Sequence, residues 1–261
     1  MKRMIFFILC TGLILALLAA CAPAATAVPT EVPTSVPPTA TPVPASPTAS
    51  AQDAVAKLHW FGTSAFLYNG SKIIYFDPVT LDGNLPKADI ILITHAHNDH
   101  YSVADLQKII GPNTALIISP NVSTNYESDK ATLGITATIL NEGDKTEVNG
   151  VSIQAVPAYD TTFHPKGSGG EGYLVTVDGI VFYMAGATDA YPEMANYTSD
   201  IAFIPVYSKN RAQAIADILP AKMIVLEHTS IYAAQAVATL FNQSYGNAKN
   251  LLALQPGPYN P

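Results

Sequence analysis

Residues 94–100 read T-H-A-H-N-D-H and directly follow the mostly apolar run A-D-I-I-L-I at residues 88–93. Three imidazoles and one carboxylate thus fall within six positions, and they include half of the six histidines of the chain. A short run of β-prone residues is typical of a buried strand, and the turn after it can direct several side chains at one point. Imidazole and carboxylate are ligands that zinc and similar cations prefer. This stretch therefore predicts a divalent metal site, and with it an enzyme.

Two further histidines occupy the same kind of position. His164 lies in a loop after an expected strand at residues 151–157, and His228 follows the apolar run at residues 223–226. Each of them alone is as compatible with a structural role as with a functional one. A sheet scaffold presents functional groups on the loops at its strand ends, so five of the six histidines are candidates for one site. The sixth, His59, is expected to be an ordinary strand residue.

The first twenty residues carry the features of a signal peptide: a basic start, an apolar stretch at residues 5–18, and Ala19-Ala20. The tetrapeptide L-A-A-C that ends in Cys21 resembles the lipobox of bacterial lipoproteins, in which the cysteine is lipidated. We therefore expect a lipoprotein signal peptide over residues 1–20. The mature protein would be extracytoplasmic and anchored to the cell membrane through acyl chains on Cys21. The alternative is an ordinary signal peptide with an incidental cysteine.

Residues 21–53 differ sharply in composition from the rest of the chain. Between residues 22 and 52 there are eight prolines and six threonines, and Glu31 is the only charged residue. Such a segment cannot bury a core. We expect a disordered tether with a reach of about 90 Å at the rise of polyproline II. Residues 54–261 are long enough for one substantial core and are expected to form the folded domain.

The net charge limits the classes of binding partner, and the cysteine content limits the residue types that could ligate a metal. Removal of the signal peptide leaves eleven Lys and Arg residues against twenty Asp and Glu residues, a net charge of about −9. This balance argues against a nucleic-acid partner, and we expect contact with a membrane only through the lipid anchor. Cys10 lies in the signal peptide and Cys21 is the expected lipidation site. Every metal ligand must then be His, Asp or Glu.

Turn signals and apolar runs outline a mixed α/β domain. Hairpin turns are expected at Asn69-Gly70, Asn149-Gly150 and Asp178-Gly179. Helices are expected at residues 102–110, 210–219 and 233–241. Strands are expected at residues 57–61, 65–68, 72–76, 88–93, 115–118, 145–148, 151–157, 172–177, 180–184, 199–206, 222–227 and 251–254. Hairpins combined with strand-helix alternation predict helices packed over sheets.

The chain resembles the metallo-β-lactamase superfamily over residues 57–256, in particular its lactonase-like and phospholipase-like branch. The matching segments are W-F-G-T-S-A-F (60–66), T-H-A-H-N-D-H (94–100), V-P-A-Y-D (156–160), F-H-P-K-G (163–167), Y-M-A-G-A-T-D-A-Y-P-E-M (183–194) and V-L-E-H-T (225–229). They occur in the order that the family shows. The resemblance implies a four-layer αββα sandwich with the metals at one edge.

The resemblance also implies two metal positions and a reaction. His95, His97 and His164 would hold one ion, and Asp99, His100 and His228 the other. The ions would be Zn²⁺, one or two per chain, with another divalent cation such as Mn²⁺ as the alternative. In most members a hydroxide between the metals attacks a carbonyl or phosphorus centre. Asp99 would also accept a proton from the attacking water.

The chain departs from the family pattern at two places. Where the family usually reads G-D-T-D, this chain has Gly186-Ala187-Thr188-Asp189, so the carboxylate that bridges both metals is replaced by a methyl group. The opening motif, usually G-H-A-S, reads Gly62-Thr63-Ser64-Ala65. Each metal still has three protein ligands, as an open catalytic zinc does. Four residues near the motifs are further candidates for the site, where each would contact either the substrate or one of the metal ligands: Asp189, Tyr159, Lys166 and Tyr207.

The sequence therefore predicts a lipid-anchored, metal-dependent hydrolase of a small ester, lactone or phosphodiester. One alternative is a catalytically impaired binding lipoprotein that keeps the fold but has lost the carboxylate at Ala187. Another is a protein that binds metal for scavenging or delivery. The surviving histidines and Asp99 favour the enzyme over both.

Overall fold

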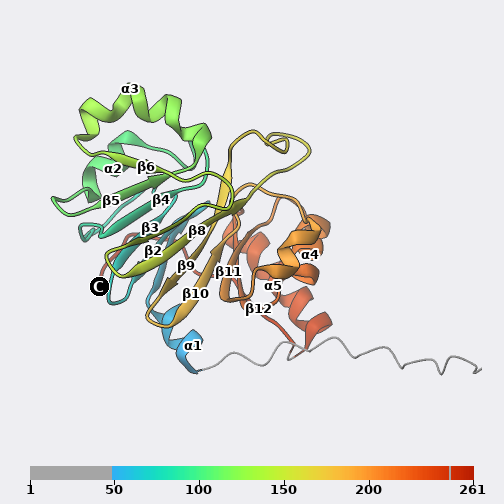
Figure 1. Ribbon diagram of the computed structural model, residues 1–261. Helices are drawn as coiled ribbons and strands as arrows, with labels where there is room; N and C mark the ends of the chain where they lie inside the picture. The colour runs from blue at the N-terminus through green and yellow to red at the C-terminus, as the bar shows by residue number, and fades with distance from the viewer. Residues whose placement is uncertain (1–48, 247) are drawn as a thin grey trace, which may run out of the picture. The chain divides into compact units, whose positions relative to one another are not determined.

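The computed structural model describes residues 49–246 and 248–261, which form two β-sheets packed face to face with helices on their outer faces (Figure 1). The expected signal peptide, Cys21 and most of the expected tether lie outside these residues. Within the described part of the chain, no helix combines the length and the apolar character needed to cross a bilayer.

The first sheet combines a hairpin-like half with a parallel half. In spatial order it contains β1 (Leu58–Gly62), β2 (Ala65–Asn69), β3 (Ile73–Phe76), β4 (Ile90–Ile93), β5 (Ala115–Ile118) and β6 (Ala137–Ile139). The β1–β2 and β2–β3 pairs are antiparallel, and the pairs from β3 to β6 are parallel. Parallel strands end at the same edge of a sheet, so the loops after β3 and β4 lie side by side.

The second sheet has the same mixed character. In spatial order it contains β13 (Asn250–Leu252), β12 (Ala221–Glu227), β11 (Ser199–Pro205), β10 (Ile180–Met184), β9 (Glu171–Val177), β8 (Val151–Pro157) and β7 (Lys145–Val148). Strands β10 to β13 are parallel, whereas β7 to β10 form antiparallel pairs. The segments after β10, β11 and β12 therefore leave the sheet at one edge.

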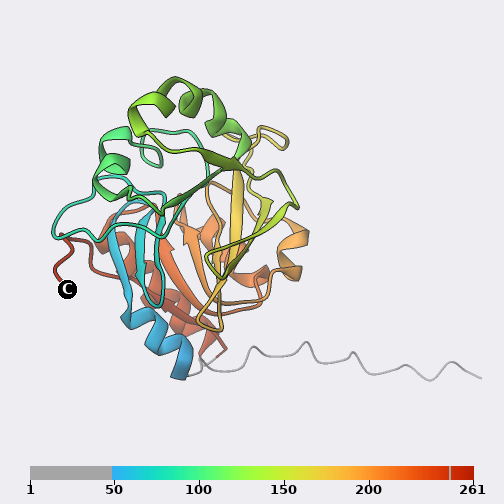
Figure 2. The ribbon, with the colours of Figure 1, turned by 60° about the vertical axis from the view of Figure 1, so that its left-hand side comes forward.

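Alternating side chains divide the core into layers. Along β12, Met223 and Val225 pack between the sheets, while Ile224 and Leu226 pack toward the outer helices, as the period of two in a strand requires. Aromatic rings fill the space between the sheets; the Phe66 and Phe203 ring centroids lie 4.5 Å apart. The described part of the chain thus confirms the expected αββα sandwich (Figure 2).

Helices cover both outer faces. They are α2 (Val103–Ile109), α3 (Ser123–Leu133), α4 (Lys209–Ile218) and α5 (Ile231–Tyr245), with short 3₁₀ turns at Pro120–Val122 and Pro192–Asn196. A further helix, α1 (Ala49–Ala56), packs against the core between the sheets. Helices α2 and α3 pack on the first sheet, and α4 and α5 on the second. Ser102, Ser208 and Ser230 cap α2, α4 and α5, each accepting a bond from a backbone amide in the first turn.

Two elements were not predicted, namely helix α3, which covers the first sheet, and β6, the edge strand of that sheet. Helix α3 is polar, and it buries only Tyr126 and Leu133. It therefore lacks the repeated apolar spacing that reveals an amphipathic helix. Strand β6 is three residues long and largely exposed, and a strand of this kind has no clear alternation in its sequence.

Two of the three expected hairpin turns are confirmed, and the third is wrong in its type. Asn149-Gly150 and Asp178-Gly179 have positive φ at both residues, as a two-residue type I′ turn requires. Asn69, in contrast, pairs with Ile73 inside the ladder. The Asp178 carboxylate accepts bonds from Tyr68 Oη at 2.7 Å and Ser71 N at 3.0 Å, and these fix a longer connection at residues 70–72.

Helix α1 spans the expected boundary between tether and domain at residues 53 and 54. Helix α1 begins at Ala49, and both Ala51 and Ala54 are buried in the core between the sheets. The segment A-S-A-Q-D-A-V-A lacks proline and is rich in alanine, the residue with the highest helix propensity. The folded part therefore extends at least to Ala49. This helix was not predicted because the Pro/Thr-rich segment continues to residue 48, directly before the helix begins.

A chain that begins at residue 54 should be less stable than one that begins at residue 42. It loses the buried Ala51 and most of α1, and we expect the free energy of unfolding to fall by roughly 1 to 2 kcal/mol. Urea denaturation of the two chains measures the difference. Equal midpoints would show that α1 contributes nothing to the core.

Candidate metal centre

All six predicted ligands lie at one edge of the sandwich. His95, His97, Asp99 and His100 are in the turn after β4, and His164 is in the loop between β8 and β9. His228 directly follows β12. The structure brings these residues together because the carboxyl ends of β4, β8 and β12 meet at this edge. That they bind metal stays a prediction.

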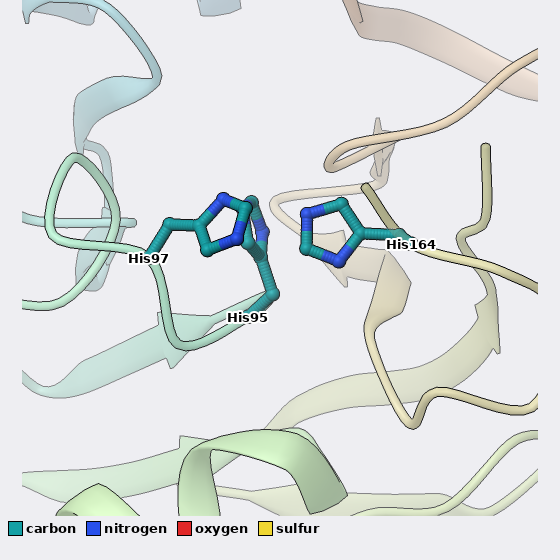
Figure 3. A group of neighbouring side chains, drawn as sticks. All are labelled: His95, His97 and His164. Carbon is teal, nitrogen blue, oxygen red and sulfur yellow. The ribbon is translucent and has the colours of Figure 1, made fainter. Parts of the chain in front are cut away.

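The six residues form two clusters. The first cluster consists of His95, His97 and His164, and the second cluster consists of Asp99, His100 and His228. Within each cluster the candidate ligand atoms lie within 4.8 Å of one another. Figure 3 shows the three imidazoles of the first cluster turned toward a common centre.

The two clusters adjoin each other. The ring centroids of His95 and His100, one from each cluster, are 3.7 Å apart. In the second cluster, Asp99 Oδ2 lies 3.2 Å from His228 Nε2, and Asp99 Oδ1 lies 3.9 Å from His100 Nε2. The Asp99 side chain is 47 % exposed, whereas His100 is buried. The arrangement therefore fits two neighbouring cations, with Asp99 on the solvent side.

Several buried ring nitrogens make no hydrogen bond to any of the residues that the structure describes. Nε2 of His95, of His100 and of His164 is inaccessible and makes no hydrogen bond. Buried polar atoms are normally paired, and leaving one unpaired is unfavourable. A divalent cation would be the partner that these three nitrogens lack, because an unpaired imidazole nitrogen can ligate a metal. The residues present therefore fit the metal that the sequence predicts.

Asp77 orients a histidine of each cluster. Its Oδ2 accepts bonds from His100 Nδ1 at 2.8 Å and from the Thr94 hydroxyl at 2.7 Å. That hydroxyl lies 2.9 Å from His95 Nδ1 and, since its proton goes to Asp77, it accepts the His95 N–H. Both imidazoles then carry their proton on Nδ1 and direct a free Nε2 lone pair into the site. A carboxylate behind a ligating histidine is the usual partner of this kind.

Asp77 directly follows the expected strand at residues 72–76, and nothing in the sequence singled it out. In the structure its backbone is unusual, with a φ of 44°. Thr63 and His228 also have positive φ, at 47° and 58°. Such values are uncommon outside glycine and concentrate at functional sites.

The opening segment W-F-G-T-S holds two ligands in place through its backbone and a hydroxyl. The Thr63 carbonyl accepts bonds from His228 N at 2.8 Å and from Trp60 Nε1 at 3.0 Å. The Ser64 hydroxyl donates to the Asp99 carbonyl at 3.0 Å. Thr63 therefore fixes the strained backbone of His228, although it is not itself in either cluster.

The loop that carries His164 is organised by Asp160. The Asp160 carboxylate accepts backbone bonds from Thr162 and Phe163 at 2.5 and 2.7 Å, and Asp160 N donates to the His164 carbonyl at 2.7 Å. This tight turn directs the His164 ring into the first cluster. It also leaves Phe163 67 % exposed at the rim of the site.

Burial and mutual repulsion favour neutral imidazoles. Burial is the main reason that the pKa of His95 lies well below its usual value, and the positive charge that His100 and His164 would carry adds to the effect. Burial likewise lowers the pKa of His164 and of His228. Because a ligating histidine must be neutral, these environments favour metal binding near neutral pH.

Only one of the four additional candidates lines the cavity over the clusters. This cavity has a volume of about 190 Å³ and is lined by His97, Asp99, Phe163, His164, Tyr207 and His228. The Tyr207 ring lies 4.7 Å from the His228 ring, and the Arg211 guanidinium lies 4.7 Å from the Tyr207 ring. Burial raises the pKa of Tyr207, so its hydroxyl stays protonated and can donate.

The other three candidates lie elsewhere. Tyr159 and Lys166 line a separate cavity of about 290 Å³ together with Glu171. Asp189 accepts a bond from Arg211 Nε at 2.5 Å and belongs to neither cluster. Its carboxylate is therefore already paired and does not stand in for the one absent at Ala187. Ala187 is buried, and its place between the two ions stays a prediction.

Two buried glutamates near this edge were not predicted. Glu171 at the start of β9 has an unpaired Oε2. Burial, and then the negative charges of Glu142 and Asp144, raise its pKa to about 8. Glu227 at the end of β12 has both oxygens buried and unpaired. Burial, and then the charges of Asp77 and Asp99, raise its pKa well above the usual value.

Replacing Asp77 by Asn should weaken metal binding by about 10- to 100-fold, because His95 and His100 lose the acceptor that orients them. Competition with a chromophoric chelator measures the affinity. Asp105→Asn is the matched control, since that buried carboxylate bonds Thr80, Leu81 and Lys108 but no histidine of either cluster. Equal affinities in the two variants would contradict the role of Asp77.

Glu171 should make stability depend on pH. An unfolded glutamate ionises near pH 4.3, whereas folded Glu171 keeps its proton until about pH 8. Its contribution is thus fully present below the unfolded pKa and is lost as pH rises through about 8. The stability of Glu171→Gln relative to wild type should therefore increase from pH 5 to pH 9 in urea denaturation with a chelator present. Glu147→Gln, an exposed site on β7, should show no such trend.

Known proteins resemble this chain over most of its folded part. A model of the β-lactamase superfamily domain matches residues 57–227. A UPF0173 metal-dependent hydrolase of Thermococcus kodakarensis is 31% identical over 225 residues, which cover 78% of this chain and 98% of that protein. A similar relative from Pyrococcus abyssi is 30% identical over 226 residues.

Two crystal structures show the same fold. One, of a protein from Parabacteroides distasonis, is 29% identical with a TM-score of 0.62 and covers 76% of this chain and 93% of its own. The other is Igni18, a metallo hydrolase of Ignicoccus hospitalis, which is 20% identical with a TM-score of 0.62 and covers 77% and 95% of the two chains. At this lower identity the likeness concerns the fold alone.

Proposed function

Because this chain belongs to the β-lactamase superfamily, we propose that it is a metal-dependent hydrolase acting on an ester, lactone or phosphodiester of a small molecule. The observation that carries the proposal is the set of partnerless Nε2 atoms at two adjoining clusters. The relatives named as metal-dependent hydrolases support the reaction class. The choice among the three bond types, and the place in the lactonase-like and phospholipase-like branch, rest on the sequence motifs.

We propose Zn²⁺ as the metal, one or two ions per chain, with Mn²⁺ as the alternative. Five imidazoles and one carboxylate suit a borderline cation, and the described residues include no thiolate. His95, His97 and His164 would hold one ion, and Asp99, His100 and His228 the other. When bound, the cations supply the Lewis acidity that lowers the pKa of water toward neutrality and polarises the scissile bond.

The protein's own groups then position the reactants. The half-exposed carboxylate of Asp99 borders the cavity and can accept the proton that the attacking water loses. Tyr207 borders the same cavity and can donate a hydrogen bond. A cavity of about 190 Å³ admits only the reacting part of a substrate, because typical ligand pockets measure about 300 to 1,000 Å³. The remainder of the substrate would lie over exposed Phe163.

The proposal extends to the location of the enzyme. The L-A-A-C sequence at Cys21 supports a bacterial lipoprotein that faces the extracytoplasmic side of the membrane. The lipid anchor would be its only attachment to the membrane. The acidic balance of the chain supports a small-molecule substrate over nucleic acid.

Metal removal and reloading test the proposed function. Chelation should abolish hydrolysis of p-nitrophenyl acetate, bis(p-nitrophenyl) phosphate or a simple lactone, and added Zn²⁺ should restore it. His164→Gln should lower the rate by at least about 100-fold, since it removes a first-cluster ligand. His59→Gln, outside both clusters, is the matched control and should keep the wild-type rate. Metal-independent activity would contradict the proposal.

Ala187→Asp separates the enzyme from its main rival, a catalytically impaired binding lipoprotein. An added carboxylate between the ions should raise both metal stoichiometry and hydrolytic rate. A wild type that binds metal without activity, together with an active Ala187→Asp variant, would support the rival. Equal stoichiometry and rate in the two forms would show that position 187 does not limit the protein.

A further inference from the structure

Glu227 lies behind the second cluster. It is the last residue of β12 and directly precedes His228. Met223 and Val225, four and two residues earlier, face the core between the sheets. Because side chains alternate along a strand, Glu227 also points between the sheets. Its carbonyl accepts a bond from Val206 N at 2.9 Å, so its backbone is held in the ladder.

The Glu227 carboxyl group has no partner in the described part of the chain. The residue is fully buried, and neither Oε1 nor Oε2 makes a hydrogen bond. Burying an unpaired carboxyl group is strongly unfavourable, and buried charges are normally paired with a cation or a metal. Its position therefore needs a compensating group that the described residues do not supply.

The charged groups that act on Glu227 are themselves acidic. They are Asp77, which orients His100, and Asp99, which belongs to the second cluster. Asp77 thus bonds one residue of the second cluster, Asp99 belongs to it, and Glu227 precedes its His228 in the chain. No Lys or Arg among the described residues forms an ion pair with any of these three. Acidic groups crowd together in this way where a cation is expected to lie between them.

The charge of the proposed ligand set also favours a further acidic group beside the second cluster. Two divalent cations would carry four positive charges, whereas Asp99 is the only anionic residue in the two clusters. The other five residues are imidazoles, which carry no negative charge. A buried anion next to the second cluster would therefore offset charge that the six ligands leave uncompensated.

We propose that Glu227 is a further acidic group of this metal centre, and that it stabilises the bound cations from behind the second cluster. This inference rests on the proposed function. Glu227 is a positioning residue here and not one of the six ligands, because its carboxyl group belongs to neither cluster. The rival explanation is a purely structural glutamate whose oxygens bind ordered water.

The experiment compares the mature full-length chain with Glu227→Gln and Glu227→Leu at one pH. Zinc affinity is measured by competition with a chromophoric chelator, and thermal unfolding is followed with and without zinc. Glu171→Gln is the matched control, because Glu171 is also buried with an unpaired oxygen but is acted on by Glu142 and Asp144 instead. Glu227 directly precedes His228 of the second cluster, whereas Glu171 lines a separate cavity.

If the proposal holds, both Glu227 variants should bind zinc about 10- to 100-fold more weakly, and zinc should raise their Tm less than it raises that of wild type. Without zinc, Glu227→Leu should be at least as stable as wild type, because an unpaired buried carboxyl group has been removed. Glu171→Gln should keep wild-type zinc affinity. A weaker zinc site in a protein of undiminished intrinsic stability is the signature that a structural role does not produce.

Three results would overturn the inference. Wild-type zinc affinity in both Glu227 variants, or failure of both to fold without zinc, would assign Glu227 a structural role and leave the proposed hydrolase intact. An equal loss of affinity in Glu171→Gln would show that any buried acid at this edge has the same effect. A wild-type chain that binds no divalent metal would overturn this inference together with the proposed function.

Discussion

The Asp77 carboxylate accepts hydrogen bonds from three donors, and the orientation of both clusters depends on them. It binds Thr94 through the backbone amide and the hydroxyl, and it binds His100 through Nδ1. The Thr94 hydroxyl in turn bonds His95 Nδ1. One buried carboxylate therefore orients His95 of the first cluster and His100 of the second, so that the Nε2 atom of each points into the site. The link joins the end of β3 to the end of β4, which are neighbours in the first sheet. Hydrogen bonds at the edge of the first sheet thus orient one histidine of each cluster.

The topology explains why residues far apart in sequence meet there. His95 lies after β4, in the parallel half of the first sheet, and His228 lies after β12, in the parallel half of the second. The face-to-face packing of the sheets brings the ends of these two strands together. The connection is direct, because the backbone of His228 donates to the Thr63 carbonyl in the turn after β1. Thr63, Asp77 and His228 all have positive φ. Their strain is tolerated because hydrogen bonds and packing over-determine the conformation, as is common at functional sites.

The sequence was sufficient for the parts of the fold and site that have local signals. A glycine in a type I′ turn and a histidine after an apolar strand are visible in a few residues, and both were placed correctly. Asp77 and Glu227 had no such signal, since their importance depends on which groups lie beside them in space. The turn at Asn69-Gly70 shows the same limit, because the Asp178 carboxylate from another hairpin determines its form. Helix α1 was not predicted because it directly follows the Pro/Thr-rich segment, and α3 was not predicted because it is mostly polar.

Charge and burial link the stability of this edge to its function. The edge concentrates partnerless imidazole nitrogens and two buried glutamates, groups that destabilise a fold when nothing binds them. A divalent cation would satisfy the nitrogens and attract the carboxylates, and binding to the folded state alone would add its free energy to folding. The large core between the sheets and under the outer helices can support this unfavourable edge. The groups that are unfavourable at this edge are therefore the same groups that would hold or attract the metal.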